Sequence, residues 1–257
     1  VVTGDVLDRA SLDSAMRGVE VAYYMVHSMS STGSFEETDR QAARNFGEAA
    51  KAAGVKGLIY LGGLGSDEEE LSPHLRSRHE VGEILRQSGL PLCEFRAAAV
   101  IVSGSASFEL IRALVERLPV MVTPRWCKGK TQPIAIDDLL DYLIEALRIP
   151  LSQYRMYEVG GADQVSYAEM MRAYGRQRGL KPLIIPVPVL TPWLSALWLG
   201  LITPLYARIS GQQMIPALLG LFRTVKQRCP SGIAPGDWLA QQDPAQLRTW
   251  IGVEGVA

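Results

Sequence analysis

The sequence predicts an α/β fold in which a parallel β-sheet, covered by helices on both faces, is followed by a small C-terminal α/β lobe. Over the first 160 residues, short apolar runs alternate with amphipathic stretches. The apolar runs are almost continuously hydrophobic, which is typical of parallel strands buried on both faces. After Gly161 the sequence becomes richer in proline and poorer in charge. We therefore expect one domain over residues 1–160 and a lobe over residues 161–257, with an irregular pattern after about residue 208.

Five segments have the composition of β-strands. Each is short, rich in β-branched or aromatic residues, and bounded by glycine, aspartate or serine. They are residues 1–3, 21–26, 57–61, 92–99 and 154–159. Parallel sheets bind ligands at the carboxyl ends of their strands, so the residues that follow each strand are the candidates for a binding site.

Helix signals lie between the strands. Ser34 with Glu37 forms a capping box before a helix that ends at Gly54, and a second helix is expected over 73–88, before Gly89. Two more helices are expected to begin at Ser107 and at Asp137. The fourth should face inward with Leu140, Leu143, Ile144 and Leu147.

The C-terminal lobe begins with a second capping box. Ser166 and Glu169 predict a helix that ends near Gly179. Residues 183–189 are expected to be extended, and residues 192–209 are expected to form an apolar helix with proline at its start.

Composition excludes several classes of function. A formal net charge of −1 argues against a nucleic-acid binder. The three cysteines lie far apart and the three histidines are scattered, so we expect no metal site. An odd number of separated cysteines is also compatible with the reducing cytoplasm, where we expect the protein to reside.

Several segments carry a resemblance to a known family. They are residues 4–8 (GDVLD), 57–65 (GLIYLGGLG), 118–126 and 132–138, together with Arg96. In this order and spacing they resemble short-chain dehydrogenase/reductase proteins, and in particular the atypical, NmrA-like branch, over about residues 1–205. The resemblance implies a Rossmann-like, doubly wound sheet, NAD or NADP as cofactor, and a small-molecule substrate.

The resemblance also implies residues that contact the adenosine half of the dinucleotide. Gly4, Asp5 and Val6 would approach the adenine, because an aspartate directly after a strand can accept a hydrogen bond from the amino group. An ordinary turn is the alternative for these residues. His27 and Ser28 would lie under the adenine ribose, and a surface loop is the alternative there.

Gly62 and Gly63 follow the strand after which catalytic members of the family place a serine or threonine. We interpret the pair as a tight turn that lets the backbone pass close to the nicotinamide. A phosphate-binding loop is excluded, because four acidic residues follow at 67–70 and would repel a pyrophosphate.

The next helix holds the positions of the family's Tyr-x-x-x-Lys pair. Here His74 replaces the tyrosine and Arg78 replaces the lysine, so His74 becomes the candidate proton donor and Arg78 the candidate ligand of the nicotinamide ribose. The alternative is a solvated helix face held by Arg76–Glu80 and His79–Glu83 pairs. We expect Arg96, in an apolar strand, to have a structural role and to pair with an acidic residue such as Asp138.

The family's first two strands and its glycine-rich phosphate turn have no counterpart in the sequence. Two βα units correspond to roughly 60 residues, so the chain resembles an N-terminally truncated member. We therefore expect the chain by itself to bind a dinucleotide weakly or not at all. The residues that determine whether such a protein binds NAD or NADP belong to the segment without a counterpart here.

The sequence thus predicts an NAD(P)-dependent oxidoreductase or epimerase-type enzyme whose C-terminal lobe completes a substrate cleft. A non-catalytic redox sensor or complex-assembly protein is the alternative, because the Tyr-x-x-x-Lys pair is substituted. Residues 183–206 carry no charge, which leaves peripheral membrane contact as a minor alternative to a buried lobe helix.

Overall fold

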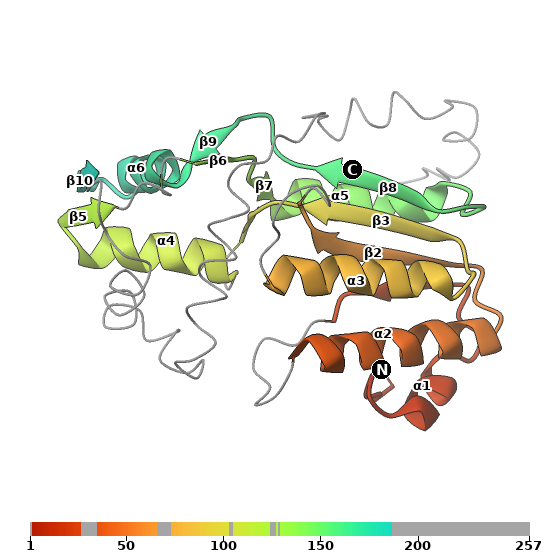
Figure 1. Ribbon diagram of the computed structural model, residues 1–257. Coiled ribbons are helices and arrows are strands. Elements are labelled where there is room, and N and C mark those ends of the chain that lie inside the picture. Colours follow the sequence, from red (N-terminus) through yellow and green to blue (C-terminus); the bar gives the residue numbers. More distant parts are fainter. Residues whose placement is uncertain are drawn as a thin grey trace.

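The computed structural model of the protein describes residues 2–26, 35–65, 73–102, 105–123, 127 and 129–186. Its centre is a four-stranded parallel sheet in the order β1-β2-β3-β8 (Figure 1). The strands are β1 (Val21–Tyr24), β2 (Gly57–Gly63), β3 (Leu92–Ala97) and β8 (Arg155–Val159). The predicted α/β class and parallel sheet are confirmed.

Helices cover both faces of this sheet. One face packs against α1 (Arg9–Ala15), α2 (Phe35–Ala52) and α3 (Pro73–Gln87), with Tyr24, Phe46, Leu58 and Leu85 in the shared core. The opposite face packs against α5 (Ile136–Glu145) and the 3-10 turn Ala146–Arg148. Every residue of β3 is buried, as expected for a strand covered on both faces.

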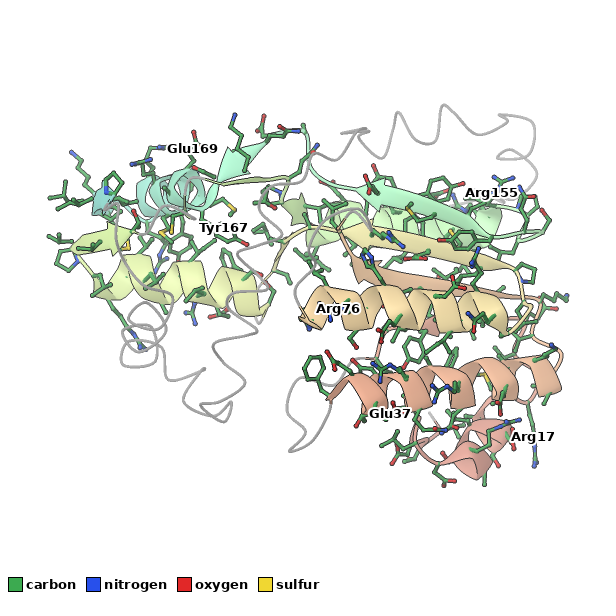
Figure 2. The ribbon with its side chains drawn as sticks, viewed as in Figure 1. Arg17, Glu37, Arg76, Arg155, Tyr167 and Glu169 are labelled. Carbon is green, nitrogen blue, oxygen red and sulfur yellow. The ribbon has the colours of Figure 1, made fainter. Side chains whose placement is uncertain are left out.

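The lobe lies beyond the carboxyl ends of β2 and β3 (Figure 1). It contains α4 (Ala106–Arg117), β5 (Val120–Thr123), α6 (Tyr167–Gln177) and β10 (Leu183–Pro186), so two of its elements come from the stretch 1–160 that the sequence assigned to the first domain. The strands β5 and β10 pair in parallel, and both helices pack on this pair around Met121 and Ile184. Tyr167 lies on the side of α6 that faces α4, while Glu169 points outward (Figure 2).

Two short strand pairs lie where the chain runs between the sheet and the lobe. The strand β4 (Val100–Ile101) pairs in parallel with β7 (Ile134–Ala135). The strand β6 (Lys130–Thr131) pairs in antiparallel fashion with β9 (Val165–Ser166). None of these four segments was expected to be a strand.

The helix boundaries are largely as predicted, with one cap displaced. The capping box of Ser166 and Glu169 is present at the start of α6. The helix α4, however, is capped by Ser105, whose Oγ accepts from the N–H of Phe108, and not by Ser107. Residues 2 and 3 form no strand, and the short helix α1 follows them under the cap of Asp8.

The inward face of α5 differs from the predicted one. Leu139, Tyr142 and Leu143 are buried against the sheet. Leu140, Ile144 and Leu147, all predicted to face inward, are 45%, 51% and 42% exposed. The prediction failed because an apolar helix with leucine or isoleucine on both sides does not define its buried side by periodicity alone.

No helix in the described part of the chain is long and apolar enough to cross a membrane. The predicted apolar helix over residues 192–209 lies outside the described residues.

Candidate functional site

The predicted site residues of the central sheet gather where β2 ends and α3 begins. The last two residues of β2 are Gly62 and Gly63, and α3 starts at Pro73 beside the same edge of the sheet (Figure 1). This is the carboxyl edge, at which open α/β sheets bind ligands, and the lobe lies beyond it.

The two glycines belong to the strand and not to a tight turn, contrary to the sequence interpretation. A Cβ atom on Gly63 would lie 2.6 Å from Leu75 Cδ2, and a Cβ atom on Gly62 would lie 3.2 Å from Tyr60 Cε1. Contacts this short require the neighbouring atoms to move. The glycines therefore let α3 and the Tyr60 ring pack closely against the end of β2.

Arg78 is anchored on the end of β2. Its Nη2 donates a hydrogen bond to the carbonyl of Leu61 at 3.1 Å, while its own carbonyl accepts from the hydroxyl of Tyr60 at 2.8 Å. The guanidinium Nε is buried and has no hydrogen-bond partner among the described residues. Because a buried donor without an acceptor is costly, this atom is the clearest unused polar group at the edge.

His74 lies four residues before Arg78, in the first turn of α3, and is half-buried. A spacing of four residues places both side chains on one side of the helix. Figure 2 shows that Arg76, two residues away from each, is also near the start of α3. The structure therefore brings His74 and Arg78 to the same edge as Gly62 and Gly63.

The alternative of a solvated helix face describes only part of α3. Glu83 is exposed and binds Arg86 and Gln87. His79, however, is buried, and its Nε2 lies 3.2 Å from the carbonyl oxygen of Gly63. Glu80 accepts from Arg40 of α2 at 2.8 Å, so this carboxylate links two helices.

A buried ion pair lies in β3, below the edge. Arg96 Nε donates to Glu94 Oε1 at 2.7 Å, and the two side chains are 9% and 2% exposed. The predicted partner Asp138 is therefore replaced by Glu94. Residues two apart in a strand point to the same face, so the alternation Glu-x-Arg was the signal that the sequence analysis missed.

Two residues in or next to β8 lie beside the Glu94–Arg96 pair. The hydroxyl of Tyr154 donates to Glu94 Oε2 at 2.9 Å, and burial, with the Glu94 carboxylate, raises the pKa of Tyr154 to about 12. Glu158 is the register partner of Arg96 in β8. Burial raises the pKa of Glu158, while Arg96 and His79 oppose that rise. A charged row therefore runs beneath α3 toward the carboxyl edge.

The N-terminal residues of the predicted site form a turn. Asp5 Oδ1 accepts from the N–H of Leu7 at 2.8 Å, and the Asp5 N–H donates to Ser11 Oγ. The carbonyl of Val6 accepts from Asn45 Nδ2 at 3.0 Å, which ties the turn to α2. Gly4 precedes this turn without pairing in a strand. His27 and Ser28 lie outside the described residues.

A separate cavity of about 470 Å³ lies between α1 and the end of α2. Arg9, Asp13 and Arg17 line one side of it, and small alanines of α2 line the other. Arg17 is seen at the outer end of α1 in Figure 2. Gly18 and Ala53, which precede β1 and β2, also line the cavity, so it lies toward the amino ends of the strands.

The first part of the chain matches a known family model. Residues 1–105 match the family described as NAD(P)H-binding. These residues include β1, β2, β3 and the helix that carries His74 and Arg78. The match agrees with the NAD(P)-binding resemblance found in the sequence.

A curated relative is the (4-alkanoyl-5-oxo-2,5-dihydrofuran-3-yl)methyl phosphate reductase of Streptomyces griseus. It is 28% identical over 191 residues, which are 71% of this chain and 60% of the relative. The chain thus spans about three fifths of the length of the curated relative.

Solved structures show the same fold. A nucleoside-diphosphate-sugar epimerase from Staphylococcus aureus superposes with a TM-score of 0.62 at 16% identity, over 93% of this chain and 82% of that one. A dTDP-glucose 4,6-dehydratase from Streptomyces venezuelae with NAD bound gives 0.60 at 17% identity, over 72% and 66%. A dTDP-4-dehydrorhamnose reductase from Bacillus anthracis in complex with NADP gives 0.58 at 14% identity, over 72% of each chain.

Proposed function

We propose that the protein is an NAD(P)-dependent oxidoreductase or epimerase-type enzyme that acts on a small molecule at the carboxyl edge of the sheet. The observation that carries the proposal is the position of Arg78. Its guanidinium is bound to the Leu61 carbonyl near the end of β2 and keeps a buried Nε without a hydrogen-bond partner among the described residues, one helical turn from His74. The NAD(P)H-binding match of residues 1–105 and the reductase relative support the same reading.

The residues at this edge fit a dinucleotide. A guanidinium is permanently charged and rich in donors, so Arg78 can donate to a ribose hydroxyl while Nη2 stays bound to Leu61. The dinucleotide, when bound, supplies or accepts the hydride.

The chain's own residues then have distinct tasks. His74 holds the proton that the substrate oxygen gains or loses, because an imidazole can both donate and accept a proton. His79, bound to the Gly63 carbonyl, positions the end of β2 beneath the reacting groups. Asp5 and Val6 would meet the adenine, with His27 and Ser28 under its ribose.

A non-catalytic dinucleotide-binding protein is the second candidate. Arg78 already makes two hydrogen bonds that fasten α3 to β2, and this structural task does not require catalysis. The substituted Tyr-x-x-x-Lys pair favours the same alternative.

Binding and catalysis are tested separately on the full-length protein. Titration with NADH and NADPH, followed by protein fluorescence, should show that Arg78→Met weakens binding about tenfold, since a hydrogen bond from a charged group contributes about 1.5 kcal/mol. Arg86→Met is the matched control. Arg86 is on the same helix and is exposed, and its described hydrogen bonds go to Glu83 of that helix. Equal binding by both variants would exclude Arg78 as a cofactor ligand.

Catalysis is tested by stopped-flow hydride transfer from NADPH to a panel of ketones, lactones and sugar nucleotides. His74→Ala should lower kcat by a factor of about 10² or more and leave cofactor affinity unchanged. Unchanged turnover in His74→Ala would remove the proton-donor assignment. Cofactor binding without hydride transfer to any member of the panel would favour the non-catalytic alternative.

A further inference from the structure

Glu158 is a carboxylate near the end of β8 that lacks a hydrogen-bond donor. It is half-buried and is the last residue but one of the strand. It makes no hydrogen bond or ion pair within the part of the chain that the structure describes. Burial raises the pKa of Glu158, because the carboxylate has lost water without gaining a donor in return. A donor placed beside this carboxylate would therefore stabilise its charge.

The side chain of Glu158 lies on the side of the sheet that faces α3. Glu158 is the register partner of Arg96, and register partners in parallel strands point to the same side. His79 of α3 acts together with Arg96 on the pKa of Glu158, against the effect of burial. The Nε2 of the same histidine lies 3.2 Å from the carbonyl oxygen of Gly63. Glu158 therefore lies toward the same edge of the sheet as the last residues of β2.

Gln132 lies next to Glu158 on this side. It is 3% exposed and connects β6 to β7, where the chain runs between the sheet and the lobe. Gly160 follows Glu158 by two residues, which puts both positions on one face of the extended chain. A Cβ atom on Gly160 would lie 3.1 Å from both Cβ and Cγ of Gln132. The side chain of Gln132 thus occupies the space that a side chain at position 160 would take.

The amide of Gln132 is held in place and keeps an acceptor without a donor. Its Nε2 donates a hydrogen bond to the carbonyl of Gly161 at 2.7 Å, which fixes the end of the amide that carries the oxygen. Its Oε1 is buried and has no hydrogen-bond partner among the described residues. Buried polar atoms are ordinarily paired, so a donor is missing at this place too.

We propose that Glu158, beside the Gln132 amide, binds a hydroxyl group of the substrate and thereby selects hydroxylated substrates. The proposal rests on the proposed function, because it names a part of the substrate bound at the same edge. A carboxylate and an amide oxygen are both acceptors, so they would repel an anionic group and bind a donor. Arg96 already supplies a positive charge beside Glu158, so a neutral hydroxyl group suits the place better than an ammonium group. Gln132 is a positioning residue, since it holds residues 160 and 161 beside the carboxylate.

The test compares ligands that differ in one group. Dissociation constants of cyclohexanol, cyclohexane-1,2-diol and 2-aminocyclohexanol are measured by ligand-observed NMR on the full-length protein, with and without NADP. The diol should bind about tenfold more tightly than the alcohol, because a hydrogen bond to a charged group contributes about that factor. Equal binding of the diol and the alcohol would overturn the proposal. Tighter binding of the amine than of the diol would also overturn it.

Variants assign the preference for the diol to its residues. Glu158→Met should remove the preference, and Glu158→Gln, which keeps one acceptor oxygen, should retain a preference of about threefold. Gly160→Ala should reduce the preference with Glu158 intact, because its Cβ atom displaces Gln132. Met156→Leu is the matched control, since Met156 lies on the same side of β8, two residues earlier, and is 41% exposed. A full preference in Glu158→Met would show that the carboxylate does not bind the hydroxyl group.

Cofactor binding separates this proposal from the proposed function. NADPH affinity should be the same in Glu158→Met as in the native chain, because the proposed cofactor ligand is Arg78 of α3. If Arg78→Met leaves NADPH affinity unchanged and the diol preference still depends on Glu158, the cofactor assignment is wrong and the hydroxyl site is supported. If Arg78→Met weakens NADPH binding and Glu158→Met keeps the diol preference, the hydroxyl site is wrong and the cofactor assignment is supported.

Discussion

The four-stranded sheet and the β5–β10 pair differ in the number of faces that helices cover. In the sheet, helices lie on both faces and the strands β2 and β3 are buried almost throughout. In the lobe, both helices lie on one face and alternate residues of β5 and β10 remain exposed. The strands β5 and β10 are as apolar in sequence as β2, whereas β3, which is covered on both faces, contains the charged residues Glu94 and Arg96. The number of covered faces is therefore decided by where the helices pack and not by the composition of the strand.

The largest difference should come from the buried ion pair, which the lobe lacks among its described residues. Glu94→Gln leaves the buried guanidinium of Arg96 without its carboxylate, and we expect a loss of about 3–5 kcal/mol in the free energy of unfolding, measured by urea denaturation. Glu94→Gln with Arg96→Met should recover most of this loss, because both charges are then gone.

The matched control for this prediction is Glu83→Gln. Glu83 and Arg86 form an exposed pair on α3, and removing such a pair costs about 1 kcal/mol or less. A loss for Glu94→Gln no greater than that for Glu83→Gln would show that the pair in β3 is not held in a dry interior.

Two neighbouring residues of β10 test the one-sided covering of the lobe. Ile184 is buried against α4 and α6, so Ile184→Ala should cost about 2–5 kcal/mol. Ile185 faces the open side, so Ile185→Ala should cost about 1 kcal/mol or less. The measurement is urea denaturation of both variants. Equal losses would mean that the side of the β5–β10 pair opposite α4 and α6 is also covered.

Thiol reactivity compares the two regions within one molecule. Cys93 lies in β3 and Cys127 lies in the core of the lobe, and burial raises the pKa of each to about 12. Both thiols should therefore resist a disulfide reagent at pH 8 until the surrounding structure opens. In a Cys229→Ser background, we expect Cys127 to react about tenfold faster than Cys93, because the lobe is covered on one side and opens at lower free energy.

The same thiols predict the direction of a pH effect. Their native pKa values exceed the ordinary value, so the native state holds these protons at a pH where the unfolded state has released them. Stability should therefore fall as the pH rises from about 9 toward 12, and the thiols should contribute nothing to the pH dependence below about 8. For the reactivity prediction, equal reaction rates of Cys93 and Cys127 would mean that the sheet and the lobe open at the same free energy.

The smallest expected effect concerns the first turn of α4. Ser105→Ala removes the cap of this helix and should cost about 1 kcal/mol. Ser107→Ala, inside the first turn, should leave stability within about 0.5 kcal/mol, because alanine is the better helix former. Thermal denaturation of the two variants decides between the cap seen in the structure and the one that the sequence suggested.

The sheet could be predicted from the sequence because its strands are short, mostly apolar segments that lie between helix signals. Residues 57–63 carry no charge, residues 92–97 carry only Glu94 and Arg96 among apolar neighbours, and glycines with positive φ close the helices at Gly54 and Gly89. The strand β5 was missed because it has four residues and directly follows a proline, and the two-residue strands β4, β6, β7 and β9 are too short for any periodicity.

The candidate site was predictable in position and less so in its contacts. Helical spacing was sufficient to place His74 and Arg78 on one side of α3. The partners of Arg96 and His79 depend on which strand or helix face the fold turns inward, and this is decided by tertiary packing. Without knowledge of that face, Asp138 was the acidic partner expected for Arg96, and His79 was expected on a solvated helix face.

The path of the chain has a consequence for the order in which the molecule assembles. The lobe is built from two stretches of chain, one before β8 and one after it, and β8 returns to pair with β3. The strands β1, β2 and β3 can pair during synthesis as soon as residue 97 has left the ribosome. The sheet is complete only after β8 has been synthesised, and the lobe is complete only after β10, which ends at residue 186. Closing so long a loop is slow, so we expect newly made chains to pass through a stage in which β3 is still a sheet edge with Glu94 and Arg96 within reach of water.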